Sequence, residues 1–146
     1  MKRGYACIGL VQPKTTENVG SALRAAFVYE AALIVTTGKR YRPVSTDTMK
    51  TYRHVPFLQV DDIFDAIPYD CVPVAVDLLE GAISLPSFSH PERAFYIFGP
   101  EDGTLGKNIT ERCRDIVIVP TRRCMNLAAT VNVVLYDRLA KQTRHP

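Results

Sequence analysis

Three segments of the sequence have residue types and spacing suited to ligand binding. The first covers residues 13–24 and contains Asn18, Gly20, Ser21 and Arg24. An Asn cap and a Gly-Ser pair at a helix start would expose backbone N–H groups to an anion. Arg24, expected one turn into that helix, could reach the same anion. The alternative interpretation is an ordinary helix capped by Asn18, with a solvated arginine.

The second segment, residues 98–106, has three glycines within eight positions and a carboxylate beside them, Glu101. Glycines let the backbone turn sharply and approach a ligand closely. Glu101 could accept hydrogen bonds from backbone N–H groups or from a ribose. The segment matches neither GxGxxG nor a P-loop, so dinucleotide binding and Walker-type phosphate binding are not supported. The alternative is a tight turn capped by Glu101.

The third segment, residues 119–130, places Asn126 as the N-cap of a long helix, followed by Ala128 and Ala129. Small residues in a first turn allow close packing against another chain segment or a flat ligand. Taken alone, this segment is a weak signal for function.

Short apolar runs alternate with helical patterns along the chain. Strands are expected at residues 6–11, 32–36, 56–60, 73–77, 94–99 and 115–119, and helices at 18–30, from about 47, after 61, at 107–112 and at 126–141. This order predicts an α/β fold with a mostly parallel sheet and helices on both faces. Residues 78–91 are expected to be irregular. Ligands of such sheets bind outside the carboxyl ends of the strands, where all three segments fall.

The composition describes an ordinary globular domain. The chain has 146 residues, 47% hydrophobic and 23% charged, with a net charge of +3, which predicts one domain. The N-terminal apolar run is better explained as a buried strand than as a signal peptide, and no run is long enough to span a membrane, so a cytoplasmic location is expected. Cysteines and histidines lack metal-site spacing, and no metal is expected.

In combination, the three segments resemble the three motifs of the SpoU/TrmH branch of the SPOUT methyltransferases. Their order and intervals match, and the resemblance extends from Gly9 to about Arg138. With no additional RNA-binding domain, the chain looks most like the minimal tRNA ribose 2′-O-methyltransferases, including the wobble-position enzymes. The matching residues are Asn18-x-Gly20-Ser21-x-x-Arg24, Phe98-Gly99-Pro100-Glu101-x-x-x-x-Gly106 and Val119-Pro120…Cys124-Met125-Asn126-Leu127.

The resemblance implies a single SPOUT domain over residues 1–146 with a C-terminal trefoil knot at about 94–141. It also implies S-adenosylmethionine as the methyl donor, bound in the knot. Carried over by position, the expected cofactor contacts are Val76, Gly99, Val119, Cys124, Met125 and Leu127.

Arg24 occupies the position of the family's catalytic arginine, often described as activating the ribose hydroxyl. An arginine is almost never neutral in a protein. We therefore expect Arg24 to hold the target phosphate and to stabilise the developing alkoxide. Glu101, Asn18 and Asn126 are expected to shape the pocket around the reacting groups.

The expected partner is RNA, with tRNA favoured over rRNA, and the resemblance implies a homodimer with the knot region and the first helix at the interface. Cations interleaved with an aromatic residue suit phosphate contacts and base stacking. The alternative is an ordinary solvated loop. The candidate RNA contacts are Lys39, Arg40, Arg42, Lys50, Arg53, Arg122 and Arg123.

Two departures from the family pattern keep other functions open. Cys124 stands where the family usually has serine, and residues 121–124 form a shorter loop than in the wobble enzymes. The alternatives are a knotted RNA-binding protein without catalysis, an rRNA 2′-O-methyltransferase, and an unrelated α/β nucleotide-binding enzyme.

Overall fold

The computed structural model describes residues 4–39 and 54–143. A single seven-stranded sheet has the order β3-β2-β1-β6-β4-β7-β5, and all of its strand pairs are parallel. The elements are β1 (Tyr5–Leu10), α1 (Thr16–Val28), β2 (Leu33–Thr37), β3 (Phe57–Val60), η2 (Ile63–Ala66), β4 (Val72–Val76), β5 (Ile83–Ser84), η3 (Leu85–Ser87), β6 (Arg93–Phe98), α2 (Lys107–Thr110), β7 (Asp115–Ile118) and α3 (Leu127–Thr143).

The predicted α/β class is confirmed, and each of the six expected strands is present with its ends shifted by at most one residue. The segment 78–91, expected to be irregular, also contains the short strand β5 and the 3-10 helix η3. The helix expected from about residue 47 lies outside the described residues. No helix of the described ranges is long and apolar enough to cross a bilayer.

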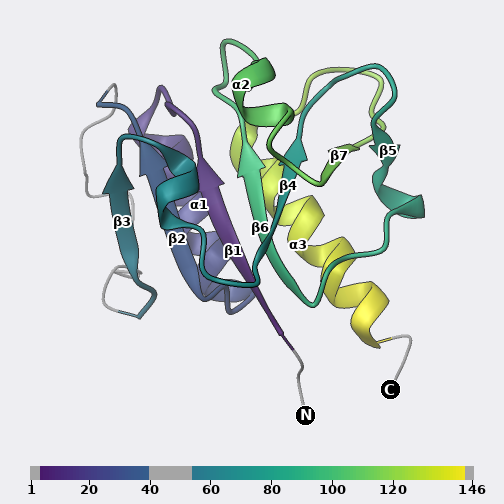
Figure 1. Ribbon diagram of the computed structural model, residues 1–146, viewed down its shortest axis with the longest axis horizontal. Coiled ribbons are helices and arrows are strands. Elements are labelled where there is room, and N and C mark those ends of the chain that lie inside the picture. Colours follow the sequence, from purple (N-terminus) through teal and green to yellow (C-terminus); the bar gives the residue numbers. More distant parts are fainter. Residues whose placement is uncertain (1–3, 40–53, 144–146) are drawn as a thin grey trace.

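The two long helices lie on one face of the sheet. α1 and α3 pack side by side behind the sheet in Figure 1, while η2 and α2 lie in front. Side chains of β1 alternate between the two layers: Ile8 and Leu10 face the long helices, and Cys7 faces the η2 side. Such strands, buried on both faces, are typical of parallel sheets. The expectation of helices on both faces is therefore met, with short helices on one side.

Gly9 on β1 allows close packing on the η2 side. A Cβ at this position would lie 2.6 Å from Cε1 of Phe95 and 3.1 Å from the side chain of Ile63. Both of those side chains are buried. A larger residue at position 9 would displace them from the second core layer.

The helix start in the first motif differs from the expectation. α1 begins at Thr16, and its N-cap is Thr15, whose hydroxyl accepts the Asn18 backbone N–H at 3.3 Å. Asn18 is therefore not the cap, and Gly20 lies inside the helix rather than at its start. Because Thr15 supplies the cap, the Asn18 side chain is available for contacts with other segments.

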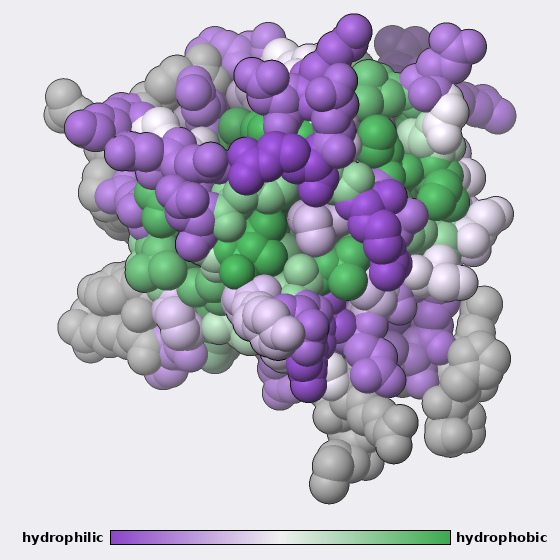
Figure 2. Space-filling view, in the orientation of Figure 1, coloured by the Kyte–Doolittle hydropathy of each residue, from purple (hydrophilic) through white to green (hydrophobic). Residues whose placement is uncertain are grey.

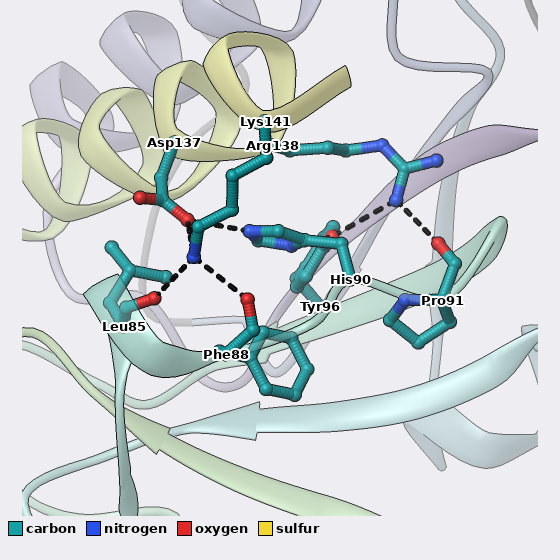
Figure 3. A network of polar contacts seen from close by, with 8 residues as sticks. All are labelled: Leu85, Phe88, His90, Pro91, Tyr96, Asp137, Arg138 and Lys141. Carbon is teal, nitrogen blue, oxygen red and sulfur yellow. Dashed lines mark hydrogen bonds and ion pairs between the residues drawn. The ribbon is translucent and has the colours of Figure 1, made fainter. Parts of the chain in front are cut away.

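A polar network fastens the C-terminal half of α3 to the segment before β6 (Figure 3). Arg138 is only 5% exposed. Its guanidinium donates hydrogen bonds to the carbonyls of Pro91 and Glu92, both at 2.7 Å, and to the Tyr96 hydroxyl at 3.1 Å. The buried charge is thus compensated by three acceptors, and α3 is held at a defined position on the sheet.

Candidate active site

A cavity of about 160 Å³ lies at the carboxyl ends of β4, β6 and β7, next to the start of α3. All six residues expected to contact the cofactor line it: Val76, Gly99, Val119, Cys124, Met125 and Leu127. The other lining residues are Asp77, Leu78, Phe98, Pro100, Glu101, Gly103, Thr121 and Thr130. The fold therefore brings the expected residues to one place, while their role in binding stays a prediction.

Gly99 allows the loop after β6 to fold back on itself at the cavity wall. A Cβ on Gly99 would lie 3.3 Å from the backbone N of Leu105 and 3.4 Å from the Leu105 side chain. Those contacts are tighter than most real Cβ contacts, so glycine permits the close approach. Leu105 is buried in the second core layer and anchors the loop there.

Asp77 is a lining residue that the sequence analysis missed. Its carboxylate accepts the backbone N–H of Leu78 at 2.8 Å and that of Leu105 at 3.1 Å. The second bond joins the end of β4 to the loop after β6. A signal was available, because Asp77 is the first charged residue after an apolar strand, where ligand-binding side chains of parallel sheets gather.

Glu101 connects the second motif to the first. Its carboxylate accepts the backbone N–H of Lys14 at 3.0 Å and of Thr15 at 3.1 Å, the Thr15 hydroxyl at 3.3 Å and the Asn18 side-chain amide at 3.1 Å. Partial burial raises the pKa of Glu101, but the hydrogen bonds from Lys14, Asn18 and Thr15 outweigh it and the pKa is lowered. The N–H groups of Lys14 and Thr15 therefore hold a carboxylate of the same chain rather than an external anion.

The candidate residues Glu101, Asn18 and Asn126 form one hydrogen-bonded chain. The Asn126 amide donates to the Asn18 side-chain oxygen at 2.8 Å, and the Asn18 amide donates to Glu101 at 3.1 Å. The Asn126 side-chain oxygen accepts the backbone N–H groups of Ala128 at 2.9 Å and Ala129 at 3.2 Å, which confirms Asn126 as the N-cap of α3. All three motifs are thus joined at the rim of the cavity.

Arg24 lies apart from this group. It is in the third turn of α1, exposed, and absent from the cavity lining. Within the described part of the chain, its guanidinium makes no hydrogen bond or ion pair. The expectation that Arg24 sits one turn into the helix was wrong, because the helix begins before Asn18. Its neighbour one turn later, Val28, is 61% exposed.

The sequence matches the family model described as the SpoU rRNA Methylase family over residues 5–136. The chain belongs to this family. No curated protein matches the sequence significantly.

Several solved structures have the same fold. The SpoU methyltransferase AviRb from Streptomyces viridochromogenes, in complex with AdoMet, has a TM-score of 0.84 at 18% identity, covering 98% of this chain and 60% of AviRb. A structure described as giving structural insights into the 2-OH methylation of C/U34 on tRNA has a TM-score of 0.83 at 22% identity. The match covers 96% of this chain and 97% of that one. The AdoMet-bound rRNA methyltransferase from Sinorhizobium meliloti has a TM-score of 0.81 at 17% identity, with 95% and 57% coverage. The chain therefore spans about 60% of the length of AviRb.

The candidate RNA contacts of this SpoU-family chain are only partly described. Lys39 is exposed after β2, and Arg122 and Arg123 are exposed between the cavity-lining residues Thr121 and Cys124. Arg40, Arg42, Lys50 and Arg53 lie outside the described residues. Within the described ranges, no group of three or more His, Cys, Asp or Glu side chains is arranged to hold a metal ion.

Proposed function

We propose that this chain transfers a methyl group from S-adenosylmethionine to a ribose 2′-hydroxyl of RNA, with tRNA as the substrate and the wobble nucleotide as the first candidate target. The observation that carries the proposal is the hydrogen-bonded chain of Glu101, Asn18 and Asn126, at the rim of the cavity that the expected cofactor contacts line. Two similar structures contain AdoMet, which supports the choice of methyl donor.

The side chains around the cavity suit this donor. Val76, Phe98 and Leu127 are buried apolar walls for a flat base, and the carboxylates of Asp77 and Glu101 give the cavity a negative charge that complements a sulfonium. The volume of about 160 Å³ is below the roughly 300–1,000 Å³ of typical ligand sites, so the cavity encloses only part of such a molecule. When bound, S-adenosylmethionine supplies an electrophilic methyl group.

Glu101 acts as a positioning residue in this proposal. Its carboxylate is occupied by donors from Lys14, Thr15 and Asn18, and its lowered pKa makes it a poor proton acceptor at neutral pH. It therefore orders the loop after β1 and orients Asn18. A general base would need a free oxygen within reach of the ribose hydroxyl.

Arg24 supplies positive charge for the RNA phosphate and for the ribose oxygen as it becomes negative. We place it at a homodimer interface, because its helix face is exposed and α3 beside it exposes Val133, Tyr136 and Leu139 at 37%, 60% and 37%. A second copy packed on these faces would cover the apolar residues. Arg24 would then lie at the boundary between the two chains. This arrangement accounts for the separation of Arg24 from the cavity of its own chain.

We further infer that residues 1–146 form one domain and that residues 94–141 form the trefoil knot. β7 supports this inference, because it lies in the sheet between β4 and β5, which follow each other along the chain. The chain must return after β6 to reach that position. Knots are rare among protein folds, so we infer this threading from the family fold and not from general packing rules.

The similarity to the structure connected with the 2-OH methylation of C/U34 on tRNA, at 22% identity and a TM-score of 0.83, supports tRNA as the substrate. The RNA would be held by the exposed cations Lys39, Arg122 and Arg123, together with Arg40, Arg42, Lys50 and Arg53.

Two measurements test the proposed function. Calorimetry with S-adenosylmethionine should show binding, and Leu127→Arg, which places a charge in the cavity wall, should abolish it. Mapping of ribose methylation in total RNA, with the gene deleted and then restored, should reveal one lost and regained site in tRNA. Absence of cofactor binding would refute the proposal. A methylation site lost and regained in rRNA would show that the substrate is rRNA and not tRNA.

A further inference from the structure

A second cavity, of about 550 Å³, lies at the same edge of the sheet but on the opposite face. It is formed where β1 and β2 end, between the start of η2 and the helix α2. Figure 2 shows this face of the molecule, with hydrophilic side chains gathered along the upper edge above hydrophobic surface in the centre. None of its lining residues belongs to the first cavity.

The second cavity has apolar walls and a fixed aromatic–guanidinium stack beside them. Val11, Ile63 and Ile109 supply the apolar surface. The Arg112 guanidinium lies 3.8 Å from the centroid of the Phe64 ring and 3.4 Å from an oxygen of Asp62. These two contacts hold the plane of the guanidinium, and its side chain is still 54% exposed. A guanidinium plane held in this way can stack on a nucleobase.

The polar groups of this cavity are better suited to a base than to a phosphate. Asp62 is occupied, since it accepts the backbone N–H of Phe64 at 3.0 Å and pairs with Arg112. Asp61 also lines the cavity, and within residues 4–39 and 54–143 its carboxylate has no hydrogen bond or ion pair. Two carboxylates against one guanidinium leave a net negative charge, which repels phosphate.

The two cavities are connected through two segments of the chain. Val11 and Gln12 line the second cavity, while Lys14 and Thr15 of the same loop bind Glu101 of the first. The loop after β6 lines the first cavity and leads directly into α2, which lines the second. Both cavities thus lie at the same edge of the sheet and are linked by the loop after β1 and the loop after β6.

We propose that the second cavity binds a guanine base that flanks the methylated ribose, an inference that rests on the proposed function. Guanine presents two adjacent N–H donors on its Watson–Crick edge, and a single carboxylate can accept both. Asp61 is that acceptor, and Arg112 stacks on the ring. Asp61 and Arg112 are thus specificity-determining residues and take no part in methyl transfer.

Titration of ¹⁵N-labelled protein with GMP, followed by NMR, tests this assignment. Amide signals around Gln12, Thr37, Asp61, Asn108 and Arg112 should shift with GMP, and IMP, which lacks one N–H donor, should bind about fivefold more weakly. Asp61→Asn should weaken GMP binding by about the same factor. The matched control is D65N, an exposed carboxylate outside the cavity, and it should leave GMP binding unchanged.

Equal shifts with ribose 5-phosphate, AMP or UMP, or unchanged affinity in the Asp61 variant, would overturn the proposal. Arg112→Lys keeps the positive charge and removes the planar guanidinium that stacks on the base, so it should also weaken GMP binding. With RNA, the Asp61 variant should raise KM and leave kcat unchanged. Calorimetry with S-adenosylmethionine separates the two hypotheses: cofactor binding without GMP binding refutes only the guanine site, and GMP binding without cofactor binding refutes only the methyltransferase.

Discussion

Glu101→Gln is the substitution that most directly tests how the three motifs are held together. The change keeps the size of the side chain and removes its charge. In the structure, one carboxylate oxygen accepts from Thr15, Asn18 and Lys14, and the other accepts from Lys14 alone. An amide has only one oxygen, so in either orientation its NH₂ group faces at least one N–H donor.

The expected loss of stability follows from these contacts. Hydrogen bonds to a charged group contribute about 1.5–3 kcal/mol each when buried, and at least one is lost while the others become neutral. Glu101 is largely exposed, and solvent screening reduces each contribution. We therefore expect the free energy of unfolding to fall by about 1–2 kcal/mol. The cost should appear in urea unfolding as a lower midpoint with an unchanged slope.

The pH dependence makes this prediction specific. The lowered pKa of Glu101 means that its contribution is present above the unfolded pKa of about 4.3 and is lost as the pH falls through the folded pKa. The difference between wild type and Glu101→Gln should thus be constant near neutral pH and shrink below about pH 4. Glu111→Gln, at an exposed position after α2, is the control and should change little. A difference that stays constant down to acidic pH would refute the assigned role of the carboxylate.

Three further predictions concern other parts of the fold. Arg24→Ala should abolish RNA methylation and leave the affinity for S-adenosylmethionine unchanged in calorimetry; equal turnover would refute its role. Arg138→Met removes the guanidinium donor of the Pro91 carbonyl, while the Glu92 carbonyl keeps the Tyr5 N–H, and should cost about 1–3 kcal/mol in urea unfolding. The control Arg93→Met, which breaks only an exposed pair with Asp70, should cost less than about 1 kcal/mol. Burial lowers the pKa of His90 despite its bond to Asp137. As the pH falls, the unfolded state therefore takes up the proton before the folded state does, and the Tm should fall below about pH 6.5. His90→Asn should remove this pH dependence of the Tm.

The sheet could be predicted from the sequence because its central strands are continuous apolar runs. β1 and β6 are buried on both faces of the sheet, so their residues are apolar without alternation and the strands can be recognised as continuous runs. β5 could not be predicted, since two residues carry no pattern. The N-cap of α1 was misplaced because Thr15, Thr16 and Asn18 are all good capping residues. The choice among them depends on Glu101, far away in the sequence.

Motif resemblance led to six residues that line the first cavity, whereas Arg24 lies apart from it and Asp77 was missed. The connections between the motifs were not predicted. Bonds such as Lys14 to Glu101 join positions 87 residues apart. No local pattern reports such a pair, so the hydrogen-bonded rim is a result of the tertiary structure alone.

The position of Glu101 has a consequence for how RNA is held. The first motif was expected to offer backbone N–H groups to an external anion, yet two of those groups bind the Glu101 carboxylate. A phosphate placed there would meet a negative charge already in position. We therefore expect side-chain cations to hold the RNA backbone, among them the exposed Arg122 and Arg123, which lie between two cavity-lining residues. Because such contacts release counterions, RNA affinity should fall steeply with salt, whereas cofactor affinity, built on apolar walls, should change little.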